Sequence, residues 1–252
     1  MIVSALRLPE LRAMAAAGVE SYVLDLPAVR HLARTGPLRL STPVTVLVGD
    51  NGAGKSTLLE ALALALGFPG MGGPVGGFHG DMWAARTGTE SRLAHHLVVR
   101  TSAPLLRGFF LRAETSFQLL TEADRPPARA GRNVLASGQS LHARSHGESV
   151  LGLVAEHVAG AGLYLFDEPE AGLSTVRQMA LLAEIDQAVD RGAQFIIATH
   201  SPVLPALPRA EILEVNEAGI LPVAYDDVES VRAMREFLDD PRGVVDYLTR
   251  PE

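Results

Sequence analysis

The feature that most constrains this chain is a glycine-rich segment placed between an apolar run and a helix-forming run. Residues 44–48 (Val-Thr-Val-Leu-Val) are almost entirely apolar and β-branched, which is typical of a strand buried on both faces. Residues 58–66 are rich in leucine and alanine and are followed by Gly67, which predicts a helix that ends there. Residues 49–57, between the two, are Gly-Asp-Asn-Gly-Ala-Gly-Lys-Ser-Thr. The sequence therefore predicts a strand, a tight loop and a helix in direct succession.

This segment matches G-x-x-x-x-G-K-[ST], the pattern of a phosphate-binding loop, or P-loop. Its glycines let the backbone curl so that N–H groups converge on a phosphate at the positive end of the following helix. Lys55 is the only lysine among 22 Lys and Arg residues, and a thin ammonium-tipped chain suits such a loop better than a guanidinium does. We expect Lys55 to reach the β- and γ-phosphates of a nucleoside triphosphate, and the Ser56 hydroxyl to ligate Mg²⁺. The nucleotide-binding residues expected here are Gly49, Asp50, Asn51, Gly52, Ala53, Gly54, Lys55, Ser56 and Thr57.

Composition limits the class of protein. A chain of 252 residues fits one large domain, or one domain with an inserted subdomain, and a hydrophobic content of 47% suffices for a sizeable core. The net charge of −7 argues against a general nucleic-acid or anionic-membrane surface, although it leaves room for a local basic patch. The absence of cysteine excludes a disulfide framework and a thiolate metal site. With no recognisable signal peptide and no apolar run of about 18 residues, we expect a soluble, cytoplasmic protein.

A second apolar run, residues 163–166, ends in the adjacent carboxylates Asp167 and Glu168. A short apolar run bounded by turn residues predicts a buried parallel strand. Because side chains alternate along a strand, the two acids can do different work. Asp167 fits the Mg²⁺ side of a site, reaching the ion through a water molecule, and Glu168 fits the general base for an attacking water. The alternative is a simple acidic turn after a strand, which the preceding P-loop disfavours.

A third apolar run, residues 195–198, delivers His200. Parallel strands end at the sheet edge where α/β folds bind ligands, so we expect His200 at the same edge as the P-loop. A neutral imidazole there can hydrogen-bond the γ-phosphate and hold the attacking water. A histidine after a strand is more often structural. The position of His200, 33 residues beyond Asp167 and after one predicted helix, favours the catalytic role.

Ser145, Gly147 and Glu148 lie at the start of an apolar helix, which is predicted to begin near Glu148 and to continue to residue 159. A hydroxyl, backbone amides and the helix dipole directed at one point would form a second anion site. An ordinary helix N-cap with an acid in its first turn fits the same residues, and the spacing leaves both interpretations open.

Taken together, the P-loop and the S-x-G-E, D-E-P-E-x-G-L-S and T-H-S-P segments resemble ABC-type ATPases. Over residues 44–202 the chain most resembles the soluble ATPases of the AAA_21/AAA_15-like group, which are related to SMC-type heads. The resemblance implies an α/β P-loop NTPase fold of ABC-ATPase type, with a mostly parallel central sheet, an antiparallel β subdomain and a small helical signature subdomain. It also implies a single domain over residues 1–252, with the helical subdomain inserted at about residues 115–160.

The same resemblance implies Mg²⁺-dependent ATP hydrolysis in an ATP-dependent homodimer. Two subunits would pair head to tail around two ATP molecules, with residues 170–174 crossing the interface. Ser145, Gly147 and Glu148 of one subunit would contact the γ-phosphate held by Lys55 of the other. The catalytic residues implied are Glu168, His200 and Lys55. The metal-side residues implied are Ser56, Asp167 and Glu114.

Three features depart from the family pattern. The signature segment is Arg-Ser-His-Gly-Glu-Ser where the pattern has Leu-Ser-Gly-Gly-Gln. Glu114 matches the position of the Q-loop glutamine, with Gln118 as the alternative. No aromatic residue is securely placed to stack on adenine, although Tyr22 or His31 could do so.

The role that hydrolysis serves is open among three alternatives. A stand-alone ATPase acting on a protein or nucleic-acid partner is favoured, because about 90 residues between Lys55 and Ser145 leave no room for long coiled-coil arms. The nucleotide-binding subunit of a membrane transporter is disfavoured by the altered signature. The third alternative, a slow ATP-gated dimerisation switch, is disfavoured because a switch has little need of a base such as Glu168 beside Asp167. The arginine-rich residues 124–145 predict a solvated linker in preference to a binding surface.

The remaining patterns predict further strands, helices and loops. We expect the tail, residues 242–252, to pack on the core as a short helix. The other elements expected are strands at residues 93–100, 108–113, 210–215 and 220–223, helices at 175–191 and 228–238, and a loop at 68–80.

Overall fold

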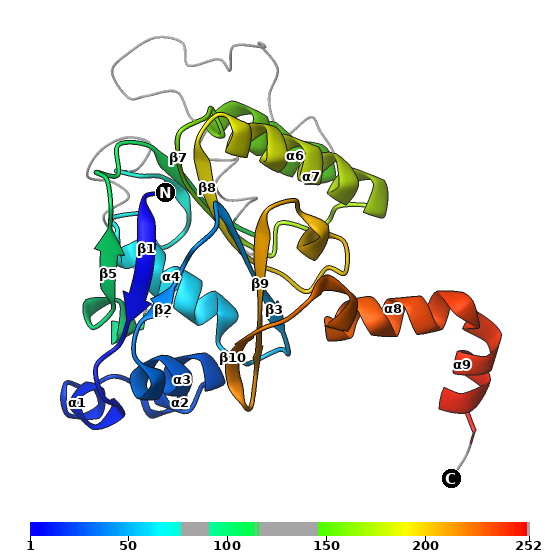
Figure 1. Ribbon diagram of the computed structural model, residues 1–252, viewed down its shortest axis with the longest axis horizontal. Helices are drawn as coiled ribbons and strands as arrows, with labels where there is room; N and C mark the ends of the chain where they lie inside the picture. Colours follow the sequence, from blue (N-terminus) through cyan, green and yellow to red (C-terminus); the bar gives the residue numbers. More distant parts are fainter. Residues whose placement is uncertain (77–90, 114, 116–145, 251–252) are drawn as a thin grey trace.

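A seven-stranded sheet forms the centre of the protein (Figure 1). The structure, a computed structural model, describes residues 1–76, 91–113, 115 and 146–250. The strands lie in the order β10 (Gly219–Pro222), β9 (Ala210–Asn216), β3 (Val44–Gly49), β8 (Ala193–Ala198), β7 (Gly162–Asp167), β6 (Gly108–Arg112) and β4 (Gly73–Pro74). The pairings from β9 to β6 are parallel, whereas β10 and β4 are antiparallel edge strands. This is the mostly parallel α/β sheet that the sequence predicts.

The central strands are apolar on both faces because helices cover both sides of the sheet. Along β7, Leu163 and Leu165 join one buried cluster, and Tyr164 and Phe166 join the other. The first cluster includes α4 (Lys55–Ala65), the helix that follows the P-loop. The second includes α6 (His146–His157) and α7 (Thr175–Asp190). Two separate cores therefore hold the strand ends in place from opposite sides.

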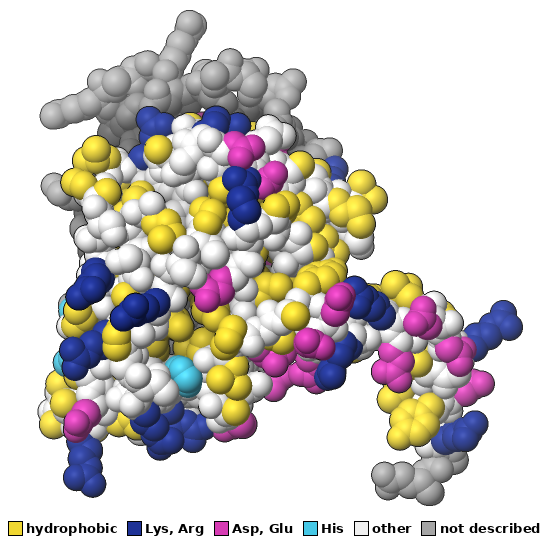
Figure 2. All heavy atoms as spheres, viewed as in Figure 1, with side chains coloured by type: hydrophobic (Ala, Val, Ile, Leu, Met, Phe, Trp, Pro, Cys, Tyr) yellow, Lys and Arg dark blue, Asp and Glu magenta, His cyan; other side chains and the backbone are white. Residues whose placement is uncertain are grey.

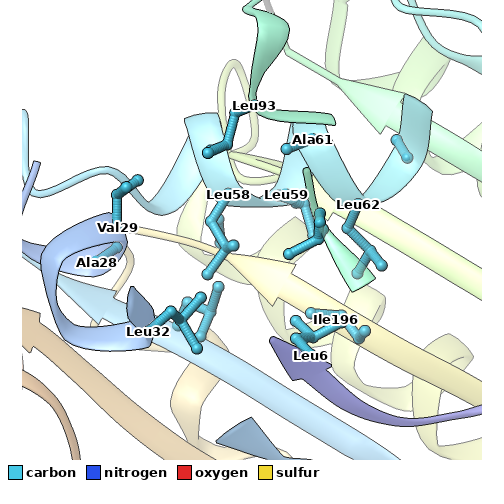
Figure 3. Close-up of a cluster of buried hydrophobic side chains, with 14 of the residues drawn as sticks. Leu6, Ala28, Val29, Leu32, Leu58, Leu59, Ala61, Leu62, Leu93 and Ile196 are labelled. Atoms are coloured by element: carbon cyan, nitrogen blue, oxygen red, sulfur yellow. The ribbon is translucent and has the colours of Figure 1, made fainter. Parts of the chain in front are cut away.

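A three-stranded antiparallel sheet, in the order β2 (Leu38–Arg39), β1 (Val3–Arg7) and β5 (Val98–Thr101), packs beside α4. Leu6 of β1 and Ile196 of β8 lie in the same buried cluster as Leu58 and Leu62 of α4 (Figure 3). The helices α1 (Leu11–Ala16), α2 (Ser21–Leu24) and α3 (Pro27–Thr35) connect β1 to β2, and the 3₁₀ turn η2 (Arg92–His95) precedes β5. The predicted antiparallel β subdomain is thereby confirmed.

Gln194 joins the two sheets. Its side chain is 1% exposed, and its Oε1 accepts hydrogen bonds from the backbone N–H groups of Ile2 (2.6 Å) and Val3 (2.9 Å). Its Nε2 donates to the carbonyl oxygen of Val3 at 2.7 Å. The side-chain amide of Gln194 thus both accepts from and donates to the backbone of β1, as the peptide groups of a neighbouring strand do. It links β1 to β8, the strand that leads to His200.

The C-terminal part leaves the body of the molecule. After the short turns η4 (Leu204–Ala206) and η5 (Tyr225–Asp227), helices α8 (Glu229–Asp239) and α9 (Pro241–Leu248) project outward (Figure 1). The expectation that the tail packs on the core is wrong, since α9 has no buried residue. Val245, Tyr247 and Leu248 of α9 are all exposed, because the helix follows α8 away from the sheet.

Most other expected elements are confirmed within a residue or two, with two local corrections. Residues 92–95 form the turn η2, so the strand expected at 93–100 is limited to β5. The Ser91 hydroxyl accepts a hydrogen bond from the N–H of Leu93 (3.1 Å), and this cap favours a turn where hydrophobicity alone suggests a strand. The expected loop at 68–80 contains the two-residue strand β4. In the described part of the chain, no helix combines the length and the apolar character needed to cross a bilayer.

Candidate functional site

The P-loop links β3 to α4 through a backbone that only glycine can adopt at two points. Gly49 has φ +119°, and a Cβ there would lie 2.1 Å from the carbonyl oxygen of Val215 on β9. Gly54 has φ +96°, and a Cβ there would lie 3.0 Å from the Cβ of Leu26. The N–H of Ala28 on α3 donates to the carbonyl oxygen of Ala53 at 3.1 Å. The loop is therefore held between β9 and the α2–α3 segment, with its end aligned to start α4.

Lys55 is folded into this loop. Its side chain is 4% exposed, and Nζ donates hydrogen bonds to the carbonyl oxygens of Gly49 (2.7 Å) and Asp50 (2.8 Å). Burial lowers the pKa of the Lys55 ammonium, and neighbouring acids, first Glu168 and then Asp50 and Asp167, partly offset that effect. The predicted phosphate-binding lysine thus lies within electrostatic reach of both predicted carboxylates.

The sheet register brings the three motifs to one edge. Leu47 of β3 and Asp167 of β7 both align with Ala198 of β8, so the P-loop, the two acids and His200 all follow neighbouring strand ends. Asp167 is 6% exposed. Ser56, in the first turn of α4, and Asp167 offer the hard oxygen donors that Mg²⁺ prefers, so the residues present fit this ion.

Glu168 has an unusual backbone conformation. Its φ is +51°, a left-handed value that costs a residue with a side chain about 1–3 kcal/mol and that tends to occur at functional sites. Its N–H donates to the carbonyl oxygen of Ala198 (2.9 Å), and its own carbonyl accepts from the N–H of Ala171 (3.0 Å). These bonds hold the turn that follows β7 and carries the Glu168 carboxylate. Its Oε1 lies 3.7 Å from Nε2 of His200, and the two side chains are 44% and 36% exposed.

Glu170 is a site residue that the sequence analysis assigned only to an interface segment. Its Oε1 accepts hydrogen bonds from the backbone N–H groups of His200 (2.7 Å) and Ser201 (3.1 Å). Its Oε2 is buried and makes no hydrogen bond to any residue that the structure describes. A carboxylate two positions after Glu168 was the available signal, but a contact spanning 30 residues is not visible in a local pattern.

Arg112 is a second residue that the sequence analysis did not assign to the site. It aligns with Asp167 across the β6–β7 pairing, and its Nε lies 3.9 Å from Oδ2 of Asp167. Its Nη1 lies 2.8 Å from Oε2 of Glu60 on α4 and donates to the carbonyl oxygen of Gly70 at 3.1 Å. The guanidinium therefore links the P-loop helix to the strand that carries Asp167. An arginine at the end of an otherwise apolar strand was the signal for it.

Several predicted site residues cannot be placed. Glu114, the alternative Gln118, Ser145 and the whole arginine-rich segment at 124–145 lie outside the described residues, as does most of the expected helical subdomain. Gly147 and Glu148 belong to the first turn of α6, and the side chain of Glu148 is also outside the description.

The two suggested adenine-stacking residues lie on the segment that contacts the P-loop. Tyr22 is on α2 and is 64% exposed. His31 is on α3 and packs against Gly219, where a Cβ would lie 2.1 Å from Nδ1 of the imidazole. Burial lowers the pKa of His31.

Two family models match the chain. Residues 29–81 match AAA_23, described as "AAA domain", and residues 139–206 match AAA_21, described as "AAA domain, putative AbiEii toxin, Type IV TA system". The first segment contains the P-loop, and the second contains Asp167, Glu168 and His200. These matches confirm the resemblance to the AAA_21 group of P-loop ATPases.

Solved structures to which this chain is similar include an SMC head domain and a subunit of an ABC transporter. The SMC head domain from Thermotoga maritima is 13% identical, with 89% of this chain and 100% of that chain covered and a TM-score of 0.45. An ATP-binding subunit of an ABC transporter is 15% identical, with 79% of this chain and 86% of that chain covered and a TM-score of 0.43. Comparison with curated proteins gives no match.

Proposed function

We propose that this protein hydrolyses ATP to ADP and phosphate in a Mg²⁺-dependent reaction, at the sheet edge formed by β3, β8 and β7. The observation that carries the proposal is the Glu168–His200 pair, with 3.7 Å between Oε1 and Nε2, at the same edge as the buried Lys55. A site that only binds nucleotide has no use for a carboxylate held in a strained turn opposite an imidazole. A site that activates water has a use for both.

In this proposal the P-loop amides and Lys55 hold the β- and γ-phosphates of ATP. The oxygen of a water molecule attacks the γ-phosphorus, and the bond from that phosphorus to the β–γ bridging oxygen breaks. Glu168 accepts the proton of the water, and His200 hydrogen-bonds the transferred phosphoryl group and orients the water. The electron pair of the broken bond stays on the bridging oxygen, which leaves as part of ADP. The protein's contribution to this reaction is to position the reactants and to stabilise the developing charge.

Mg²⁺, held by Ser56 and by Asp167 through a water molecule, would neutralise charge on the β- and γ-phosphate oxygens. Glu114 is retained as a proposed third metal-side residue. Arg112, 3.9 Å from Asp167, helps to keep that carboxylate oriented.

We further propose that the active form is a homodimer with ATP between the subunits. Ser145, Gly147 and Glu148 of one subunit would then complete the site built on Lys55 of the other. The proposal keeps the chain as one ATPase domain, with residues 115–160 as its signature subdomain, working in the cytoplasm on a protein or nucleic-acid partner. The family matches support the ATPase part of this proposal, and the dimer rests on the sequence resemblance.

Glu168→Gln tests the proposal directly. The amide cannot take the proton but keeps the size of the side chain, so we expect ATP to bind while phosphate release falls by about 10²-fold or more. Light scattering with and without ATP and Mg²⁺ should show an ATP-dependent change from monomer to dimer in this variant. Lys55→Ala is the matched control, which should neither bind ATP nor dimerise.

Each outcome decides one part of the proposal. Phosphate release at the wild-type rate by Glu168→Gln would exclude Glu168 as the base. ATP bound to a monomer at all concentrations would exclude the homodimer and leave the ATPase assignment standing. ATP-dependent dimers of a wild-type protein that releases no phosphate would establish a nucleotide-gated switch instead.

A further inference from the structure

A basic groove lies on the antiparallel sheet, away from the ATP site. It has a volume of about 530 Å³ and is lined by three strands and the segment before β2. Its basic residues are Arg7 on β1, Arg39 on β2 and Arg100 on β5, and all three are exposed. The other lining residues are Ser4, Ala5, Leu6, Pro37 and Val98. None of the described residues that line it is acidic.

Strand register places the three arginines on one face. Ala5 aligns with Arg39 on one side and with Arg100 on the other, and Arg7 is two residues further along β1. Neighbouring strands are about 4.8 Å apart, so the Cα atoms of Arg39 and Arg100 lie about 10 Å from each other. The small Ala5 between them leaves space above the sheet into which the guanidinium groups can converge.

The charges of the three groove arginines are not paired with acids of the described part of the chain. None of the three forms an ion pair with a residue in the described part of the chain. Three other surface arginines are paired with acids: Arg30 with Glu217, Arg209 with Asp186 and Asp190, and Arg235 with Asp226. Figure 2 shows Lys and Arg side chains gathered over the region where Figure 1 draws β1, β2 and β5. In a chain of net charge −7, this face is a local concentration of unneutralised positive charge.

We propose that this groove binds the phosphodiester backbone of a nucleic-acid duplex. The planar fork of a guanidinium matches phosphate oxygens in a bidentate manner, and three such groups over about 10 Å suit a row of phosphates. Among the residues that the structure describes, no aromatic side chain lines the groove, so this lining offers no stacking platform of the kind on which single strands depend. It also lacks the aromatic anchors at the centre of typical protein interfaces. Contacts of this kind position a duplex without reading its sequence.

The test is duplex binding by the nucleotide-free protein, measured as fluorescence anisotropy of a labelled 30-base-pair DNA of arbitrary sequence between 50 and 200 mM salt. Three phosphate contacts predict a slope of log K against log salt of about −2.7. The triple variant Arg7→Gln, Arg39→Gln, Arg100→Gln should bind about tenfold more weakly or worse at 50 mM salt, with the slope near zero. The matched control Arg30→Gln, Arg209→Gln, Arg235→Gln loses the same charge elsewhere and should keep the wild-type slope.

Several results would overturn the proposal: no binding of the duplex by wild-type protein at 50 mM salt, equal losses in the two triple variants, or tighter binding of a 30-nucleotide oligo-dT than of the duplex. Binding of anionic phosphatidylserine vesicles without binding of the duplex would also overturn it. If the triple variant fails to fold, Arg39→Gln alone, at an edge strand, should lower the magnitude of the slope by about 1. Because these measurements use no nucleotide, their failure would leave the proposed ATPase activity untouched.

Discussion

Glu170 holds the backbone that carries His200. The Glu170 carboxylate accepts the His200 N–H at 2.7 Å and the Ser201 N–H at 3.1 Å, so one side chain in the turn after β7 sets the exit of the chain from β8. The same turn presents Glu168, whose Oε1 lies 3.7 Å from Nε2 of His200. The proposed base and the proposed phosphate-sensing histidine are therefore placed relative to each other by a third residue, which is a positioning residue.

This relationship predicts the effect of Glu170→Gln. The neutral amide accepts more weakly than a carboxylate, by about 1 kcal/mol for hydrogen bonds of this kind, so His200 should be less well held. We expect kcat for ATP hydrolysis to fall about tenfold, with KM for ATP changed less than about threefold, because the P-loop is untouched. Steady-state kinetics measures both, and Glu184→Gln, exposed on α7, is the control. An unaltered kcat would remove Glu170 from the positioning of the site.

The contact between Arg112 and Glu60 predicts a non-additive pair of mutations. Both side chains are mostly buried, 16% and 17% exposed, and lie 2.8 Å apart. Arg112→Met removes the cation and leaves the mostly buried carboxylate of Glu60 without its charge partner. The free energy of unfolding should therefore fall by about 2–3 kcal/mol. Arg112→Met with Glu60→Met should recover about half of that loss or more. Urea unfolding of the single and double variants measures the coupling, and strict additivity would show that the pair does not act as a unit.

His157 predicts a pH-dependent loss of stability. Burial lowers the pKa of His157 to about 4, and its ring stacks on Phe109 with centroids 4.5 Å apart. In the unfolded chain the pKa is about 6.5, so the unfolded state binds the proton first as pH falls. Stability from this group is therefore complete above about pH 6.5, and about 2 kcal/mol is lost between pH 7.5 and pH 5. Urea unfolding at both pH values should show this slope in the wild type and a smaller one in His157→Phe; equal slopes would contradict the assignment.

Gln194 predicts a mutation that separates the two sheets. Gln194→Leu removes three hydrogen bonds to Ile2 and Val3 and leaves buried backbone groups without partners. We expect the free energy of unfolding to fall by about 2–4 kcal/mol. Relative to the wild type, amide exchange should become faster in β1 and change less in β7. Gln187→Leu, at an exposed position of α7, is the control and should cost little. Unchanged exchange in β1 would show that the strand is held by its apolar contacts alone.

Local sequence patterns determined much of this protein. A strand buried on both faces appears in the sequence as an apolar run, which predicted the strands before Asp167 and His200. A phosphate-binding helix start needs glycines with positive φ, which predicted the P-loop. The helical period of apolar residues predicted α7. The parallel order of the strands then follows from helices placed between them. For the same reason the motifs were expected at one sheet edge, where the structure has brought Lys55, Glu168 and His200.

The tertiary structure alone decided which distant residues meet. Glu170 contacts His200 across 30 residues, Gln194 contacts Val3 across 191, and the three arginines of the basic groove come from three strands whose register no local pattern encodes. Hydrophobic periodicity tells which face of an element is buried, but pairing and register depend on the free energy of the whole packed core. Polar contacts between elements, which position the site and shape the charged groove, are consequences of that packing and become visible only in the folded chain.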